Sequence, residues 1–432
     1  MRLLPRGGAF QERDFVRLWG AQASSAIGAR VTRTALPVMA VLISGSPFAV
    51  GLLVALALGP AVLVSLATGG LIERSRKRPI LIAADLARGA AVFSLPVAAW
   101  AGVLTMAQLY AVASLVGIGT AVFQIADRAY LPTLLDRDLL VAGNSTLEAT
   151  EAVAEIAGPG LAGVLIQALT APVAVLVDAL GYLASASLLH RIRKVEAPPL
   201  VEASPSVWRD IKLGFGASWS HPLVRPVFLA VAASTFFTGT FASLYYIYLL
   251  DHLGLSLRTF GIVVAMGGIG SLVGAIGSAP ITRRLGLGRA MFLLLLFHES
   301  ASLLTPAASG PDWLVLVFLF GHQLIGDAFA VAFMVQEVSL RQRVLPLEVL
   351  SRSNAAFQAM SGALLPLGAL ASGALAEVIG VRATLWIGMG SAALTTPLFL
   401  LPLWRVKDVP AGPAVTSPGS PALPAGPPGS SA

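Results

Sequence analysis

Long apolar stretches, separated by short polar connectors, follow one another along almost the whole chain. Most are about 20 residues or longer, which is the length that a helix needs to cross a bilayer. Barrel strands would show alternation over about ten residues, and none is found here. Because backbone groups in lipid must be hydrogen-bonded internally, the stretches predict helices. We expect twelve, at roughly 15–43, 48–72, 79–103, 106–131, 139–168, 171–190, 224–250, 257–282, 288–308, 312–338, 346–376 and 380–404.

The composition agrees with a chain whose main solvent is lipid. Hydrophobic residues make up 56% of the 432 residues and charged residues only 12%, against about 25% charged residues in soluble domains. The chain has no cysteine, which excludes disulfides, iron–sulfur clusters and thiolate metal sites. Its five histidines are scattered, and the HExxH and GxSxG patterns of hydrolases are absent. We therefore predict no enzyme, no cofactor and no metal site.

The longest polar connector, over 191–223, divides the chain into two halves. It contains Pro198, Pro199 and Pro205, and its stretch from 207 to 219 predicts a surface helix. The tail after Val409 is rich in Pro, Gly, Ser and Ala and has no charge, a composition that cannot bury enough surface to fold. The predicted organisation is a six-helix bundle over 1–190, the connector over 191–223, a second six-helix bundle over 224–408, and a disordered tail over 409–432.

Lys and Arg gather in alternate connectors and at both ends of the chain. The opposite connectors hold only Arg258 and Arg382. Because basic connectors stay in the cytoplasm, we predict a multi-pass protein of the cell (inner or plasma) membrane, with both termini, the 191–223 connector and the tail in the cytoplasm. One basic face also explains the net charge of +7 without a nucleic-acid partner. The basic set includes Arg74, Arg76, Lys77, Arg78, Arg191, Arg193, Lys194, Arg283, Arg284, Arg289, Arg341, Arg343, Arg405 and Lys407.

The two halves resemble each other at a constant offset. Residues of the same type recur 210 positions apart in several distant regions. Duplicated six-helix halves with a binding site between them are a transporter design. The predicted fold class is therefore all-α integral membrane, with twelve transmembrane helices in two pseudo-symmetric six-helix bundles. The recurring pairs are Gly51 with Gly261, Arg74 with Arg284, Asn144 with Asn354, and Gly163 with Gly373.

The connector between the second and third expected helices carries a recognisable motif. From Gly69 to Pro79 it reads GGLIERSRKRP, which resembles the loop signature of the major facilitator superfamily, Gly-x-Leu-Ala-Asp-Arg-x-Gly-Arg-Lys-Pro. Glu73 stands where the family has Asp and keeps the charge; Arg76 replaces a Gly. An ordinary basic loop is the alternative. The resemblance implies the fold of that superfamily and an inner gate formed by Gly69, Glu73, Arg74, Lys77 and Arg78.

The fifth expected helix carries a second motif around Pro159. The sequence from Ala154 to Gly163 is similar to a Gly- and Pro-containing motif found mostly in exporters of the superfamily. Pro159 removes a backbone hydrogen bond and predicts a kink, while Gly158 and Gly163 allow another helix to approach; a plain packing kink is the alternative. Three further segments look like the branch that holds macrolide-type drug exporters and siderophore exporters, namely 127–145, 177–179 and 352–354.

Charged residues occur at membrane depth, where they are costly and usually functional. Arg30 and Arg33 share one face of the first helix, and Glu148, Glu151 and Glu155 share one face of the fifth. At 1.5 Å per residue, Arg30 and Glu151 both lie about 18 Å deep, and Arg33 and Glu155 about 22–24 Å deep. Either a static ion-pair ladder or a part of the transport cycle would fit. Other deep groups are Asp178, Asp327, and Asp85 with Arg88, which we expect to form a local pair.

An aromatic stripe follows the seventh expected helix. Phe237, Phe241 and Tyr245 are spaced three to four residues apart, and such stripes more often contact lipid or neighbouring helices than a ligand. Together with His322 in the tenth helix they are candidate lining of a substrate cavity. His322 and Asp327 differ by five positions, so they do not share a face of a regular α-helix.

The sequence therefore predicts a secondary active transporter. By resemblance it would export a small amphiphilic compound, drug-like or siderophore-like, by proton-coupled alternating access. Its expected partners are the small-molecule substrate, the proton and the lipid bilayer, and we expect a monomer. Buried carboxylates such as the glutamates of the fifth helix suit proton coupling. A regulatory or assembly protein on the same scaffold, or a non-exporting solute permease, remains an alternative because fold does not prove function.

Overall fold

A computed structural model describes residues 8–73, 75–194, 196 and 207–407 of the chain. Within these residues every regular element is a helix. Eleven helices are long and apolar enough to cross a membrane, and a bent pair within 140–169 brings the number to twelve. The predicted class, an all-α membrane protein with twelve spans, is confirmed. The tail predicted to be disordered, 409–432, lies outside the described residues.

The first half follows the predicted pattern of spans closely. Each predicted stretch corresponds to one span, and the sixth is broken by a short turn at Val175. The surface helix predicted in the connector is also present, as α8. The elements are α1 (Arg13–Ser44), α2 (Pro47–Glu73), α3 (Lys77–Trp100), α4 (Met106–Leu134), α5 (Leu140–Leu169), α6 (Ala171–Ala174), α7 (Leu176–His190) and α8 (Val207–Ser220).

The second half has more interruptions than the sequence predicts. Its seventh and tenth spans contain π-helical turns, η3 (Tyr248–His252) and η4 (His322–Gly326). Such turns are rare in proteins overall, but they are often found at functional sites. Its last span ends in a 3-10 helix, η5 (Pro397–Leu403). The α-helices are α9 (Val224–Ile247), α10 (Leu257–Leu285), α11 (Leu287–Ser302), α12 (Leu304–Ala307), α13 (Asp312–Gly321), α14 (Asp327–Val344), α15 (Leu347–Ile379) and α16 (Val381–Thr395).

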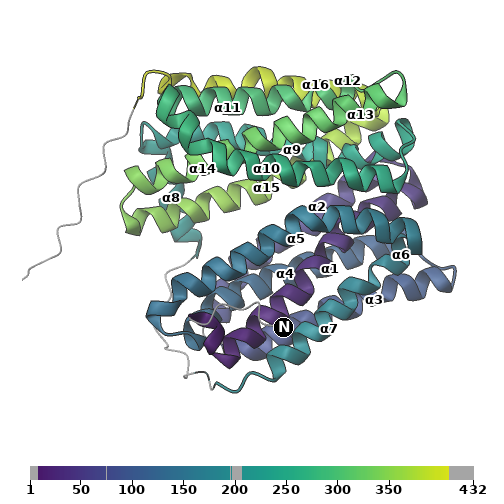
Figure 1. Cartoon of the computed structure of the whole chain (residues 1–432), viewed down its shortest axis with the longest axis vertical. Helices are drawn as coiled ribbons and strands as arrows, with labels where there is room; N and C mark the ends of the chain where they lie inside the picture. The colour runs from purple at the N-terminus through teal and green to yellow at the C-terminus, as the bar shows by residue number, and fades with distance from the viewer. Residues whose placement is uncertain (1–7, 74, 195, 197–206, 408–432) are drawn as a thin grey trace, which may run out of the picture.

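The two halves form separate bundles that meet along two helix pairs. In Figure 1 the first half lies below and the second above, and α2 packs against α15 while α5 packs against α10. A Cβ at Gly163 would lie 2.9 Å from the carbonyl oxygen of Leu257, and a Cβ at Gly373 would lie 2.9 Å from that of Pro47. Both pairs are related by the 210-residue offset. We call the α2–α15 and α5–α10 helix pairs the two seams. The same close backbone contact is made once in each seam, as pseudo-two-fold symmetry requires.

At one end of the molecule, hydrogen bonds join the first half to the second half. There the Ser46 hydroxyl donates a hydrogen bond to the Glu377 carboxylate, and the Phe48 N–H donates to Glu377 Oε1 at 3.2 Å. A Cβ at Gly51, one turn along α2, would lie 2.5 Å from the carbonyl oxygen of Ala369. We call this the closed end.

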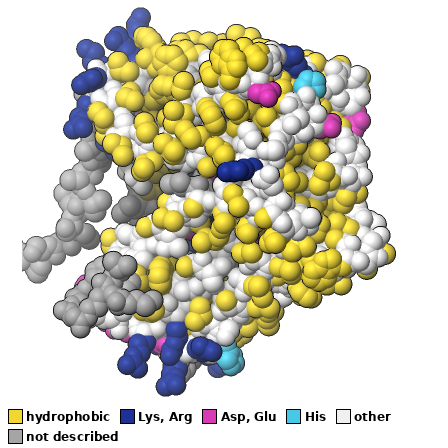
Figure 2. All heavy atoms as spheres, turned by 45° about the vertical axis from the view of Figure 1, so that its right-hand side comes forward, with side chains coloured by type: hydrophobic (Ala, Val, Ile, Leu, Met, Phe, Trp, Pro, Cys, Tyr) yellow, Lys and Arg dark blue, Asp and Glu magenta, His cyan; other side chains and the backbone are white. Residues whose placement is uncertain are grey.

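The opposite end carries most of the basic residues. Figure 2 shows Lys and Arg side chains gathered at this end of both halves, with hydrophobic side chains over much of the surface between. The chain enters α1 and leaves η5 here, so both described termini lie at this end. We call it the basic end. Its charges stand where polar lipid headgroups would meet the protein.

The connector helix α8 is packed on the second half. A Cβ at Gly214 would lie 1.9 Å from the carbonyl oxygen of Arg352, so α8 and α15 touch through their backbones. Phe228 of α9 makes edge contacts with Phe215 of α8, at 5.3 Å, and with Phe357 of α15, at 4.8 Å. The Ser218 and Ser353 hydroxyls are also hydrogen-bonded at 2.8 Å. These contacts fix α8 to the second bundle rather than to the first.

Candidate functional site

A cavity of about 720 Å³ lies between the two halves. Its first-half wall comes from α1, α2, α4 and α7; its second-half wall comes from α15 between Ala355 and Leu365, with Ile211 of α8. Since α15 starts at the basic end, this is the part of α15 nearer to that end. The cavity therefore extends from the middle of the molecule towards the basic end. We call it the central cavity.

A second cavity of about 530 Å³ lies wholly within the first half. It shares lining residues with the central cavity, among them Arg30, Thr120, Gln124 and Tyr182, so the two adjoin. Its wall is more polar, with several charged side chains from α3, α4 and α5. We call it the side cavity. All charged residues that line either cavity belong to the first half.

The charges predicted at matched depths in α1 and α5 form ion pairs with one another; Arg30 and Arg33 line the central cavity and Glu151 lines the side cavity. Arg30 Nη2 lies 2.7 Å from Glu151 Oε2 and 2.9 Å from Glu155 Oε2, and Arg33 Nη2 lies 2.5 Å from Glu155 Oε1. Glu155 thus bridges both arginines. About half of the Arg33 and Glu155 side chains is exposed, against 19% for Arg30. Glu148, the third glutamate of the predicted set, lines the side cavity and forms no ion pair with a described residue.

Helix α5 changes direction next to this cluster. Its parts Leu140–Glu155 and Gly160–Leu169 are bent by 50°, around the position where the sequence predicts a kink. A Cβ at Gly158 would lie only 2.4 Å from Arg30 Cβ. Because Gly158 has no side chain, the aliphatic part of the Arg30 side chain fits against α5 here. The Glu155 carboxylate, which binds the Arg30 guanidinium, lies one turn away. The Pro159 side chain is outside the described part of the structure, and Gly163 lies in the α5–α10 seam.

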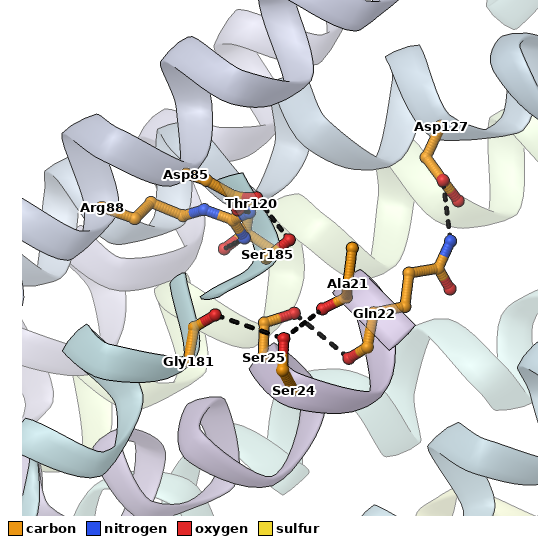
Figure 3. A network of polar contacts seen from close by, with 10 residues as sticks. All are labelled: Ala21, Gln22, Ser24, Ser25, Asp85, Arg88, Thr120, Asp127, Gly181 and Ser185. Atoms are coloured by element: carbon orange, nitrogen blue, oxygen red, sulfur yellow. Dashed lines mark hydrogen bonds and ion pairs between the residues drawn. The ribbon is translucent and has the colours of Figure 1, made fainter. Parts of the chain in front are cut away.

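A buried network in the first half extends the local pair predicted in α3. Arg88 donates to Asp85, and the Ser185 hydroxyl of α7 donates to the second Asp85 oxygen at 2.5 Å. Figure 3 shows these side chains converging from α3 and α7. The Arg88 guanidinium also lies 4.4 Å from the ring centroid of Tyr182 and 4.6 Å from that of Phe123. Only Asp85 with Arg88 was visible from the sequence; their partners are distant along the chain.

A second group of polar contacts ties α1 to α4 and α7. The Gln22 amide donates to Asp127 Oδ1 at 2.7 Å, and the Ser24 hydroxyl donates to the carbonyl oxygen of Gly181 at 3.3 Å. A Cβ at Gly181 would lie 2.5 Å from the Ser24 carbonyl oxygen, so α1 and α7 approach closely. Asp127 and Gln22 both line the side cavity. No sequence pattern indicated these contacts.

The aromatic stripe and His322 form a cluster inside the second half. The ring of Phe241 stacks on Tyr245 at 4.1 Å and on His322 at 5.2 Å, and His322 Nδ1 lies 3.2 Å from the carbonyl oxygen of Ala301. Tyr245 and His322 are buried. Phe237 and the other members of the cluster are not among the residues that line the central cavity in this conformation. They remain candidates only for a different conformation.

Asp327 begins α14 directly after the π turn η4. A Cβ at Gly267 of α10 would lie 2.1 Å from Asp327 Oδ2, so the carboxylate is packed against the backbone of α10. His298 is the basic side chain that acts on its charge, and Glu155 of the first half acts on it from across the seam.

The predicted gate motif is described only in part. Arg74 lies outside the described residues, and so do the side chain of Glu73 and the surroundings of Gly69. Both Glu196 oxygens accept backbone N–H bonds at 2.6 Å, from Lys77 and Arg78. The acid thus caps the first turn of α3, where a negative charge is favoured. The Arg78 side chain donates to the carbonyl oxygens of Leu189, at 3.0 Å, and His190 at the end of α7.

No cluster of His, Asp and Glu that could hold a metal ion is found in the part of the chain that the structure describes.

Comparison with known proteins identifies the scaffold. A sequence model described as Major Facilitator Superfamily matches residues 18–341. No curated protein matches the chain significantly in sequence.

Several solved structures share the fold over nearly their full lengths. A bacterial homologue of the iron transporter ferroportin in its inward-facing state is 17% identical, with a TM-score of 0.70 over 91% of this chain and 99% of that one. An outward-facing state of such a homologue is 18% identical and scores 0.57, over 90% and 98%. The nucleoside transporter NupG is 11% identical and scores 0.70, over 90% and 99%. At these identities the likeness is one of fold.

Proposed function

The chain belongs to the major facilitator superfamily, and we propose that it is a secondary active transporter that exports a small amphiphilic compound by proton-coupled alternating access. One observation carries this proposal. A 720 Å³ cavity between the halves has a charged wall on one side, apolar walls elsewhere, and a sealed closed end. A volume of this size suits a drug-sized ligand.

The orientation is part of the same proposal. Basic connectors favour the cytoplasm, so the basic end would face inwards in a cell membrane, and the closed end outwards. The structure would then represent an inward-facing state. The higher TM-score with the inward-facing ferroportin homologue, 0.70 against 0.57 for an outward-facing one, agrees with this assignment.

Movement between states would use the halves as rigid bodies. We take residues 1–190 and 224–408 as the moving units, with α8 travelling with the second because it is packed on α15. Opening the closed end must break the Glu377 hydrogen bonds with Ser46 and Phe48. The loop from Gly69 to Arg78 would close the basic end in the alternate state, as the resemblance implies. Lys77 and Arg78 are held in place for that by Glu196 and the end of α7.

Glu155 is the group that we propose to carry the proton. It is shared by two arginines, half exposed, and next to the bend of α5. Protonation would cancel its charge and release Arg33, which has no other ion pair among the described residues. Asp327 of the second half, whose carboxylate is packed against α10, would take part in the same step.

The export assay tests the function itself. Cells that produce the protein, and cells that lack it, are loaded with a panel of labelled amphiphiles of positive, zero and negative charge, including a macrolide and a siderophore. We expect at least one compound to accumulate less in producing cells, and a protonophore to abolish the difference. Equal accumulation of every compound, with folded protein present in the membrane, would refute export and favour a regulatory role. Higher accumulation would indicate a permease.

A further inference from the structure

Asp178 is a buried carboxylate without a partner at the wall of the central cavity. It lies in the first turn of α7, and its exposed fraction is 0%. Neither of its oxygens has a hydrogen-bond partner in ordinary geometry among the described residues. Unpaired charged groups at membrane depth are costly, so a group retained in this position has a ligand as its best explanation.

The surroundings of Asp178 are shaped to keep the carboxylate in place. A Cβ at Gly28 of α1 would lie 2.5 Å from Asp178 Cα, so α1 and α7 touch here through a glycine. The Thr32 hydroxyl, one turn further along α1, is buried beside the carboxylate, outside ordinary hydrogen-bond geometry. Both Thr32 and Asp178 line the central cavity. A carboxylate and a hydroxyl without partners in ordinary geometry thus meet at one point of the cavity wall.

The basic residue that acts on Asp178 is already committed elsewhere. Arg88 is that residue, but its guanidinium donates to Asp85 and to Thr120 and lies over two aromatic rings. One guanidinium therefore serves two carboxylates, and a negative charge is left over. A bound cation would compensate it.

The wider charge balance has the same sign. The described charged residues that line the two cavities, together with their ion-pair partners, comprise six carboxylates and four guanidinium groups. Arg30 and Arg33 are neutralised by Glu151 and Glu155, so they do not offer a site to an anion. The second-half wall of the central cavity carries no charge. The excess charge around the two cavities is therefore negative, which favours a cation over an anion.

We propose that the central cavity binds a monovalent organic cation, with the Asp178 carboxylate as counter-ion and the Thr32 hydroxyl as a second polar contact. This inference rests on the proposed function and names the charge class of its substrate. A single unpaired carboxylate does not suit a metal ion, which needs several oxygen ligands. It suits an apolar cation, whose body fills the cavity while its charge lies against Asp178.

Two probes of equal shape and opposite charge test the proposal. Tetraphenylphosphonium and tetraphenylborate are titrated into the full-length protein in lipid nanodiscs, with empty nanodiscs subtracted. Binding is followed by calorimetry for the wild type, Asp178→Asn, and Asp251→Asn as a matched control. Asp251 is an exposed acid in η3 outside both cavities. Melting temperatures establish that each variant is folded.

We expect the wild type and Asp251→Asn to bind the phosphonium, and Asp178→Asn to bind it at least about thirtyfold more weakly. The borate should bind the wild type no better than Asp178→Asn. Unchanged phosphonium affinity in Asp178→Asn, or equal binding of both probes to the wild type, would overturn the inference. The latter result needs no variant and stands even if Asp178→Asn fails to fold. Export of a neutral or anionic amphiphile by a protein that does not bind the phosphonium would sink this inference alone and leave the transporter function intact.

Discussion

Glu155→Gln is expected to leave the protein folded but to uncouple substrate movement from protons. The substitution removes the charge that Arg30 and Arg33 share and leaves Arg33 without an ion pair among the described residues. Because about half of the Arg33 and Glu155 side chains is exposed, the loss of their ion pair is partly screened. The cost in folding free energy should be about 1 kcal/mol or less. The large effect should be on proton coupling, because the variant lacks the carboxylate that binds the proton during the transport cycle.

The measurement is substrate-driven proton release from reconstituted vesicles. Wild-type protein should release protons when substrate is added, and Glu155→Gln should fall to the background of empty vesicles. Asp312→Asn is the control, since Asp312 is an exposed acid at the start of α13. Full proton release by a well-folded Glu155→Gln variant would remove Glu155 from the coupling mechanism.

A double variant separates the two interpretations of the ion-pair ladder. Arg33→Leu combined with Glu155→Leu removes both charges together. If the pair is only structural, the double variant should fold and transport like the wild type. If the pair belongs to the cycle, it should fold and still fail to transport, which is the result that we expect.

Arg88→Leu is expected to cause the largest loss of stability of any single substitution considered. Asp85 is completely buried beneath Arg88, so removing the guanidinium leaves a buried carboxylate without its cation. Breaking a buried pair in this way costs about 3–5 kcal/mol. The contacts of Arg88 with Phe123 and Tyr182 are lost as well. We expect little folded protein.

Thermal unfolding in detergent checks this prediction. Adding Asp85→Asn should recover part of the stability, because an amide keeps a contact for Ser185 without a charge. Arg258→Leu, at an exposed position in the first turn of α10, is the control and should change the melting temperature little. A melting temperature of Arg88→Leu equal to that of the wild type would show that the network is dispensable for folding.

The sequence predicts the spans and the α1–α5 charges well for simple reasons. A span must be apolar over a fixed length, so its existence can be read without knowing its neighbours. Depth follows from a rise of about 1.5 Å per residue, which puts Arg30 level with Glu151 and Arg33 level with Glu155, as the structure also does. The 210-residue offset works in the same way, because Gly163 and Gly373 are needed for the same backbone contact in both seams.

The other contacts of the candidate site depend on which face of each helix points towards the interior of the protein. A sequence that is apolar on all faces does not indicate that face. Phe241, Tyr245 and His322 do stack together, yet within the second bundle rather than at the central cavity. Asp178 reads as an ordinary packing acid until its missing partners are known. The π turn η4 depends on the backbone hydrogen bonds where α13 and α14 meet. The periodicity of the side chains along the sequence does not indicate such a turn.

Alternating access is the central claim, and cysteine labelling tests it most directly, because the chain has no cysteine of its own. Gln358→Cys places one thiol on the cavity wall of α15. Ser46→Cys with Glu377→Cys provides a lock across the closed end, where the two native side chains are hydrogen-bonded. A membrane-impermeant bifunctional thiol reagent, added from outside, links that pair. Ser94→Cys with Gln108→Cys is the control lock, since both residues lie in the first half.

The locked protein is then treated with an impermeant thiol label, in right-side-out and in inverted membrane vesicles. With the closed end locked, the thiol at 358 should react from the cytoplasmic side only. With the control lock it should also react from outside, more slowly, as the closed end opens during the cycle. Reaction from both sides in the locked protein, or from neither side in any form, would contradict alternating access through the central cavity.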